Sequence, residues 1–519
     1  MKRTLKLFSA ALLAAVVFSL VGCGSASNSF TWFVDTIPAN LDPQVASAAS
    51  DVIACENLYS GLVRKDPGGQ LQPELCDRWE ISADRRTYTF YLKDSLCYTA
   101  AKGAATEYTI TADDFVFAFR RMFRAETNSP YAVEFSAIEN SAAVLSGAMP
   151  ETSLGVSAHG EQTLVFQLSV PDENFLSKLT LPGAMPCDEA FFNSTRGTYG
   201  LSTASTLSSG SFYIYNWTSG GLFLRREPSG SRIDNLRLVQ NTNAAGQSAE
   251  QLISNEKCSA ALDDTGAQTA LQSIAYSDTT WALLFRCDSV FSSTELRQAL
   301  ASVARDAAEV PDTGLFTAAS GLIPEGLTVD GIDYRAAAGD PLPAIPDAKE
   351  LYRTARQGMQ NSDFNKVTLL LPAGSGLTQA AEQINGAWQK QFSLFFSVEE
   401  VEPEEFAKRL AEGSYTIALA PISAESGSVY SILTQFTAAG GGLAHYENSL
   451  YATQLAASAS ATGSTRCSLL AECERQLLQD SAAVPLFAQQ KRLLVANGIH
   501  DLIFDPFGPV LDLTYATKE

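Results

Sequence analysis

Val367-Thr-Leu-Leu-Leu371, a helical stretch at 377–391 and Phe392-Ser-Leu-Phe-Phe-Ser-Val398 follow one another and decide the fold class. The two outer runs are rich in β-branched and aromatic residues, as strands are. The central stretch has the apolar spacing of a helix. A strand, a helix and a second strand in this order predict an α/β lobe.

More elements are expected on both sides of this unit. Upstream, apolar residues recur at helical spacing from Ser293, and residues 348–358 predict another helix. Downstream, the Ala/Ser-rich stretch 455–465 predicts either a surface loop or a weak helix. The run from Val484 to Val495 predicts a strand that returns to the first lobe.

The first half of the chain predicts a mixture of strands and helices. Thr111 is a helix N-cap followed by Asp113 and Asp114, whose charges favour a helix N-terminus. A helix is also expected over 50–63. Strands are expected at 30–34, 79–81, 87–92, 164–168, 212–216, 222–225 and 233–239.

The first 29 residues have the pattern of an export signal followed by a tether. Lys2, Arg3 and Lys6 precede an uncharged run from Leu7 to Leu20, and Leu-Val-Gly-Cys23 closes the segment. A run of 14 residues is short for a membrane span, which needs about 20. We therefore expect a signal peptide over 1–22 and a tether over 23–29. The ending resembles a bacterial lipobox, which implies that Cys23 carries a lipid.

Length and charge limit the function classes. A chain of 519 residues predicts more than one lobe. The formal net charge is −21; without the three signal cations, 33 basic side chains face 57 acidic ones, a balance of −24. Such a surface repels phosphates and argues against nucleic acid binding. It favours cationic or zwitterionic solutes, or serves solubility alone.

Eight cysteines besides Cys23 are scattered along the chain, at 55, 76, 97, 187, 258, 287, 467 and 473. An even number outside the cytoplasm permits disulfides. Buried single thiols are the equally good alternative. No Cys-x-x-Cys spacing occurs, which argues against a zinc ribbon.

Catalytic motifs are missing from the sequence. The three histidines, His159, His445 and His500, lack metal-protease spacing, and neither a nucleophile elbow nor a phosphate-binding loop occurs. We expect no enzyme activity, no catalytic residue, no metal site and no cofactor. A binding function remains.

The order of several motifs resembles the family 5 extracellular solute-binding proteins of ABC importers, which include oligopeptide, dipeptide and nickel binders. The early motifs are Asn40-Leu-Asp-Pro43, Glu56-Asn-Leu-Tyr-Ser-Gly-Leu-Val-Arg-Lys-Asp66, Gly69-Gln-Leu-Gln-Pro-Glu-Leu75, Trp79-Glu-Ile-Ser82, Thr87-Tyr-Thr-Phe-Tyr-Leu92 and Thr111-Ala-Asp-Asp-Phe115. The later ones are Gly210-Ser-Phe-Tyr213, Leu296-Arg-Gln-Ala-Leu300 and Pro485-Leu-Phe487.

The resemblance implies an α/β fold of the type II periplasmic binding-protein class with a hinged cleft and an inserted extra lobe. Lobe I would comprise 30–55, 176–275 and 489–519, lobe II would comprise 56–175, and lobe III would comprise 276–488. Solute would be enclosed between lobes I and III. The implied partners are a peptide or other small solute and an ABC permease with its ATPase.

The same resemblance implies ligand-binding residues. Glu425 follows the strand Tyr415–Ala420 at the place where peptide-binding relatives carry an aspartate for the ligand ammonium. Asp35, Thr36 and Ile37 follow the first strand, where relatives contact the ligand backbone. Tyr430 and Phe436 are candidates for a side-chain pocket. Leu419, Pro421, Ile422 and Pro403 depart from the arginine and aromatic residues that are common there.

We therefore expect a monomeric, lipid-anchored, extracytoplasmic binding protein that delivers peptides to an importer. A binder of another solute, such as a metal chelate, is one alternative. A surface signalling or chaperone-like lipoprotein with the same fold is the other.

Overall fold

The computed structural model describes residues 28–172, 174–241, 246–344, 347–424, 427–461, 463–507 and 510–519. The expected signal peptide, the lipid attachment at Cys23 and nearly all of the tether lie outside these residues. Glu425 lies outside them as well.

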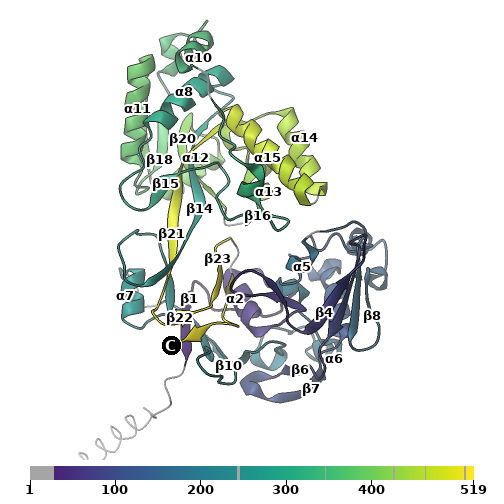
Figure 1. The fold of residues 1–519 in the computed structure, drawn as a ribbon. Helices are drawn as coiled ribbons and strands as arrows, with labels where there is room; N and C mark the ends of the chain where they lie inside the picture. Colours follow the sequence, from purple (N-terminus) through teal and green to yellow (C-terminus); the bar gives the residue numbers. More distant parts are fainter. Residues whose placement is uncertain are drawn as a thin grey trace, which may run out of the picture.

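Three bodies, each with its own hydrophobic core, make up the chain (Figure 1). Lobe III lies at the top of the view, lobe I at the bottom beside the C-terminus, and lobe II at the lower right. The boundaries expected from the sequence stay a prediction. Leu179, Ala184 and Leu207, which those boundaries give to lobe I, pack in the core of lobe II.

Lobe I is built on a four-stranded sheet in the order β1-β12-β11-β10. β1 runs parallel to β12, and the other neighbours are antiparallel. The strands are β1 (Ser29–Val34), β10 (Tyr213–Thr218), β11 (Gly221–Arg225) and β12 (Asn235–Gln240). Around them lie α2 (Ala49–Leu58), α7 (Ala249–Ser254), β22 (Ile499–His500), β23 (Ile503–Asp505), β24 (Val510–Asp512) and β25 (Thr517–Lys518).

Lobe II packs a second four-stranded sheet, ordered β4-β5-β9-β8, against α3. Aromatic rings meet edge to face in its core, for example Phe119 on Phe166, with centroids 4.9 Å apart. The main elements are β2 (Val63–Lys65), β3 (Leu71–Pro73), β4 (Cys76–Ile81), β5 (Thr87–Leu92), β6 (Cys97–Thr99), β7 (Ala105–Thr109), α3 (Ala112–Met122), α4 (Ser141–Leu145), β8 (Val156–Ala158), β9 (Thr163–Gln167), α5 (Phe175–Lys178) and α6 (Glu189–Ser194).

Lobe III contains a larger sheet in the order β13-β21-β14-β20-β18-β19, with β15 paired to β21. Its strands are β13 (Ala260–Asp263), β14 (Gln272–Phe285), β15 (Phe316–Ala318), β18 (Thr368–Pro372), β19 (Ser397–Val401), β20 (Ile417–Ser423) and β21 (Ala483–Val495). The smaller β16 (Thr328–Val329) and β17 (Ile332–Asp333) form a separate pair. The helices are α8 (Thr294–Ala307), α9 (Tyr334–Ala338), α10 (Ala348–Ala355), α11 (Thr378–Phe392), α12 (Pro403–Ala411), α13 (Val429–Thr434), α14 (Ser449–Ser460) and α15 (Gly463–Gln479).

Side-chain alternation divides this sheet between two cores. Trp281, Leu283 and Phe285 of β14 enter the core that includes residues of α8 and α11. Ala282 and Leu284 enter the opposite core, which includes residues of α13, α14 and α15. Because successive side chains of a strand point to opposite faces, both faces of β14 are buried here. The continuous apolar run of the strand follows from this double burial.

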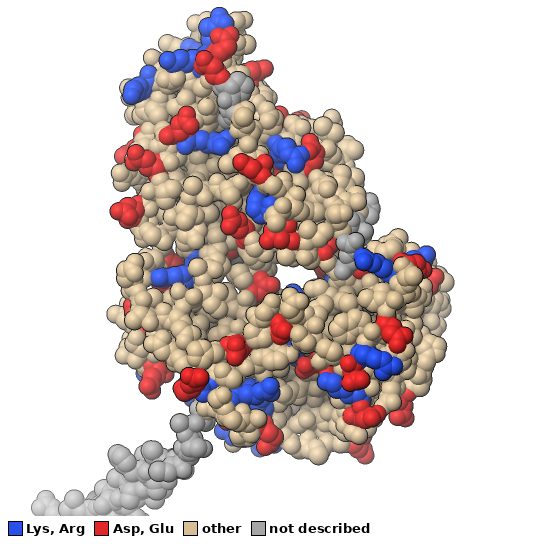
Figure 2. Space-filling view, in the orientation of Figure 1, with Lys and Arg blue, Asp and Glu red and all other residues tan. Residues whose placement is uncertain are grey.

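Strands β14 and β21 are much longer than their neighbours and run from lobe III down into lobe I (Figure 1). They pair antiparallel, and the register shifts between Tyr276 and Thr279 and again between Trp281 and Ala282. The predicted limits of lobe III, 276 and 488, fall inside these two strands. An opening is visible between the upper and lower bodies (Figure 2). We call the β14–β21 pair the hinge ribbon.

Most of the expected elements are present. The βαβ unit is confirmed as β18, α11 and β19, with β18 parallel to β19. The Thr111 cap is confirmed as a capping box with Asp114. The strand that returns to lobe I is confirmed as β21, whose last residues Leu493 and Val495 lie in the lobe I core.

Some boundaries differ from the prediction. The helix expected over 50–63 ends at Leu58, because Gly210 N–H donates to the Leu58 carbonyl and Ser60 N–H donates to Ser209 Oγ. The strand expected over 392–398 starts at Ser397, because α11 extends to Phe392. Residues 455–460 belong to α14 and residues 463–465 to α15, so the loop alternative is wrong for these residues. The eight cysteines from Cys55 to Cys473 are all free thiols, and most are buried.

Candidate solute-binding cleft

A cavity of about 790 Å³ lies between lobe I and the hinge ribbon. Its walls come from the end of β1, the start of α2, β13, the ribbon, and the hairpin of β23 and β24. Its volume lies within the range of about 300–1,000 Å³ that is typical of small-ligand sites. We call it the acidic compartment, after its charged lining residues Asp35, Asp263, Asp264, Asp278, Asp505 and Lys491.

Two of these carboxylates form ion pairs. Asp278 on β14 bonds Lys491 on β21 at 2.8 Å and is 5% exposed. Asp263 accepts from Arg492 at 2.5 Å and from the Thr265 hydroxyl at 2.7 Å. Burial raises the pKa of Asp263, but the bonds from Thr265 and Arg492 outweigh burial, so its pKa is lowered. The Asp263 carboxylate therefore carries its charge near neutral pH.

Asp35 and Asp264 are exposed at the same cavity. The Asp35 carbonyl accepts from Gln240 at 2.8 Å, which fixes the backbone where β1 ends. Five carboxylates and one lysine give the compartment a negative field. That field favours a ligand with a positive group.

Apolar side chains line the acidic compartment and the cavity beside it. Tyr276 of β14 and Phe504 of β23 meet edge to face, with centroids 5.6 Å apart. Leu262 and Ile274 on the strands that join the lobes are 54% and 39% exposed. Apolar walls with a few fixed polar groups are typical of ligand cavities.

A second cavity, of about 780 Å³, lies beside the first. It is bounded by the β2–β3 turn of lobe II, the hinge ribbon, the C-terminal hairpin and residues 317–326 of lobe III. Four hydroxyl-bearing residues belong to its lining: Ser277, Thr280, Thr317 and Ser320. We call it the hydroxyl compartment.

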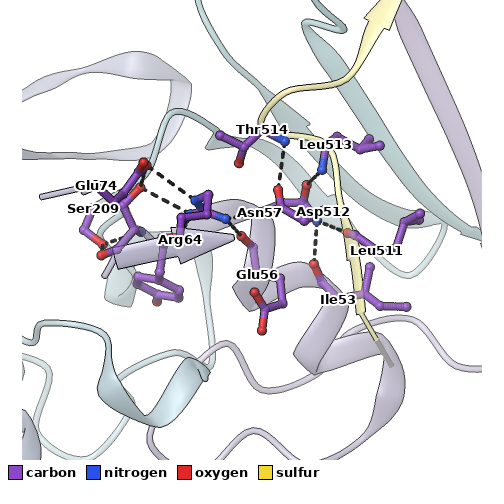
Figure 3. A network of polar contacts seen from close by, with 12 residues as sticks. Ile53, Glu56, Asn57, Arg64, Glu74, Ser209, Leu511, Asp512, Leu513 and Thr514 are labelled. Carbon is purple, nitrogen blue, oxygen red and sulfur yellow. Dashed lines mark hydrogen bonds and ion pairs between the residues drawn. The ribbon is translucent and has the colours of Figure 1, made fainter. Parts of the chain in front are cut away.

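The hairpin of β23 and β24 is fixed to lobes I and II by a buried polar network (Figure 3). Arg64 Nη1 donates to Asp512 Oδ2 at 2.5 Å, and both residues are at most 6% exposed. Asn57 donates to the Leu511 carbonyl at 2.7 Å and accepts from Leu513 N–H at 2.9 Å. These bonds hold the base of the hairpin in one place.

Glu56 lies in the same network and is 8% exposed. Burial and then the nearby Asp512 carboxylate raise its pKa to about 8, although Arg64 acts in the opposite direction. The Glu56 carboxyl is therefore mostly protonated at neutral pH.

The hairpin tip reaches lobe III. The Phe507 ring packs against a lobe III core. A Cβ at Gly326 would lie 3.1 Å from that ring, and a Cβ at Gly427 would lie 2.4 Å from the Phe507 carbonyl oxygen. The hairpin therefore contacts all three lobes.

The residues expected at the binding site have different locations. Asp35 and Thr36 line the acidic compartment, and Thr36 Oγ1 lies 3.4 Å from Ser50 Oγ. Ile37 lines a separate shallow hollow with Trp217. Phe436 is fully buried in a lobe III core, and Tyr430 is half-buried against the same core. Their contact with a ligand stays a prediction, as does that of Glu425.

Sequence reasoning missed Tyr276, Asp278, Lys491 and Phe504. None of them stands in a motif with chemical meaning, and only the pairing of β14 with β21 brings Asp278 to Lys491. The one signal was the length of the β-rich run from Val484 to Val495, which exceeds that of an ordinary strand.

The part of the chain that the structure describes contains neither a metal-binding cluster nor a membrane-spanning helix. No set of three or more His, Cys, Asp or Glu side chains there has the arrangement of a metal site. Among the helices of the described ranges, none combines the length and apolar character of a membrane span.

Comparison with known proteins identifies the family. Residues 70–443 match the family of bacterial extracellular solute-binding proteins, family 5, middle region. Because this match covers more than half of the chain, the chain belongs to family 5 of the extracellular solute-binding proteins. Members of this family bind solutes for transport and are not enzymes, and they act outside the cytoplasm.

Individual relatives agree with this assignment. The dipeptide-binding protein of Lactococcus lactis subsp. cremoris is 25% identical over 399 residues, which is 70% of each chain. The probable deoxycholate-binding periplasmic protein YgiS of Escherichia coli is 34% identical over 151 residues. That match spans 29% of this chain and only 27% of the relative.

Solved structures show the same fold. The peptide-bound OppA of Listeria monocytogenes matches with a TM-score of 0.62 and 18% identity, over 95% of this chain and 99% of that one. The expected type II binding-protein fold is therefore confirmed.

Proposed function

We propose that this chain captures peptides for an ABC importer and encloses them between lobes I and III. The observation that carries the proposal is the acidic compartment, which is bounded by lobe I, the hinge ribbon and the C-terminal hairpin. Relatives described as dipeptide-binding and oligopeptide-binding proteins support a peptide as the solute.

The chemistry of the compartment supports the same ligand class. Exposed Asp35 and Asp264 offer carboxylates to a ligand ammonium, and the end of β1 offers backbone groups to an extended chain. Glu425 is a further candidate for the ammonium partner. The described residue next to it, Ala424, donates its N–H to the Asp278 carbonyl at 2.7 Å, beside the compartment.

A lipid on Cys23 would hold the protein at the outer face of the cytoplasmic membrane, next to the permease. The LVGC pattern supports this part of the proposal. Metabolic labelling with a fatty-acid analogue tests it: the wild-type chain should incorporate label, and Cys23→Ser should not.

Thermal shift measurements test the binding proposal directly. Mature protein without residues 1–23 should melt at a higher temperature with pools of random peptides, because a ligand that binds only the native state stabilises it. N-acetylated pools of the same lengths serve as the control and should give a smaller shift. No shift with any peptide pool would contradict the proposal.

A steroid-like amphipathic solute is a second candidate. The Escherichia coli relative described as probably deoxycholate-binding favours it, and so do the exposed Leu262 and Ile274 near the cavities. A shift with deoxycholate and none with peptides would favour this alternative.

A further inference from the structure

Four residues line both cavities of the cleft: Tyr276, Phe504, Asp505 and Pro506. One comes from the hinge ribbon, and the other three come from the C-terminal hairpin. The acidic and hydroxyl compartments therefore adjoin at these four residues, which lie between them.

Other residues of the hinge ribbon line one compartment or the other. Asp278 and Lys491 face the acidic compartment, while their chain neighbours Ser277 and Gln490 face the hydroxyl compartment. The ribbon therefore contributes residues to the lining of both compartments. At the four shared residues, a route between the compartments passes between the ribbon and the hairpin.

Two aromatic rings close that route. The rings of Tyr276 and Phe504 meet at 61° with centroids 5.6 Å apart. The hairpin that carries Phe504 is held at its base by the buried Arg64–Asp512 pair and at its tip by Phe507 in lobe III. The base of the hairpin is therefore fixed to lobes I and II, and its tip contacts lobe III.

We propose that Tyr276 and Phe504 form a partition that sets the maximum length of the ligand. The proposal rests on the peptide-binding function above. With the partition closed, a peptide is confined to the acidic compartment of about 790 Å³. Without it, the peptide extends into the hydroxyl compartment, which adds about 780 Å³.

The test uses purified mature protein and peptide pools of single defined lengths, from two to eight residues, with random sequence. Affinity for each pool is measured by titration calorimetry for the wild type, Phe504→Ala and Tyr276→Ala. Phe504→Tyr keeps a ring in place and serves as the rescue variant. Tyr352→Ala removes one ring of a stacked pair on α10 and α11, remote from both compartments, and serves as the matched control.

The wild type, Phe504→Tyr and Tyr352→Ala should lose affinity beyond the same length. In Phe504→Ala and Tyr276→Ala the limit should move to longer peptides, with binding just above the wild-type limit tightened on the order of tenfold. Two independent alanine variants keep the test valid if one of them fails to fold.

Identical length profiles in all five proteins would overturn the partition while leaving the peptide function intact. Loss of affinity at every length in the alanine variants, with an unchanged limit, would also overturn it. Failure of the wild type to bind any pool would instead reject the peptide function and the partition with it.

Discussion

The junction between lobes I and II differs sharply from the junction between lobes I and III. At the first, Arg121 of α3 forms two bonds of 2.6 Å to Asp42, and both residues are buried. Tyr131 and Ser129 add bonds to the carbonyls of Ala46 and Gln44. With the Arg64–Asp512 pair, these contacts make lobes I and II one rigid unit.

The second junction depends on fewer elements. The hinge ribbon, with its two register shifts, connects lobe I to lobe III. The hairpin tip at Phe507 touches lobe III, and lobe II approaches it where Asn174 lies close to Gly331. Irregular strand pairing next to a cavity is where a domain hinge is expected. From this contrast we propose that lobe III is the moving jaw.

A variant that breaks the junction between lobes I and II should lower the stability of the protein more than any other variant described below. Arg121→Ala leaves the buried Asp42 carboxylate without its partner, which should cost about 3–5 kcal/mol of stability. The matched control is Arg353→Ala, which removes an exposed arginine–glutamate pair and should cost at most about 1 kcal/mol. Denaturant unfolding of both variants measures the difference. Equal losses would contradict the rigid-unit account.

The pH dependence of stability tests the role of Glu56 in the buried polar network. The pKa of Glu56 is about 8 in the folded state and 4.5 in its ordinary state. The folded state therefore binds more protons between these values, and stability from Glu56 is lost as pH rises from about 4.5 through 8.

Glu56→Gln removes this titration. The variant should gain about 1–3 kcal/mol over the wild type at pH 8 and little at pH 4.5. Melting temperatures across this range provide the measurement. A constant difference between the two proteins at all pH values would mean that Glu56 ionises normally.

The smallest loss of stability is expected where the C-terminal hairpin contacts lobe III. Gly427 has φ +63° and touches Phe507, while Gly374 in the same lobe has φ +75° and open space around its Cβ position. Alanine at either position should cost about 1–2 kcal/mol for the left-handed backbone. The stability loss of Gly427→Ala should exceed that of Gly374→Ala by less than about 1 kcal/mol, because lobe III can swing away from the hairpin. A much larger excess in melting experiments would indicate a rigid contact.

Local signals in the sequence predicted much of the fold. The Thr111 and Asp114 capping box and the β18–α11–β19 unit each depend on neighbours in sequence, which a pattern can reveal. The family motifs predicted the type II binding-protein fold for the same reason: their order is a property of the sequence.

The site depends on contacts between distant segments, which local patterns do not contain. Tyr276 meets Phe504 only after β21 has returned the chain to lobe I. Glu56 has a raised pKa because folding buries it beside Asp512. Phe436, chosen as an aromatic residue near the expected pocket, lies in a core because α13 packs over the sheet of lobe III.

Distance measurements between paired spin labels test the moving jaw most directly. Exposed positions are available in each lobe: Tyr215 in lobe I, Val133 in lobe II and Phe395 in lobe III. Labels are attached to cysteines at these positions in a Cys97→Ser background, since Cys97 is exposed. With a peptide pool that raises the melting temperature, the 215–395 distance should change and the 215–133 distance should not. A constant 215–395 distance in the liganded protein, or a change in 215–133, would contradict the account.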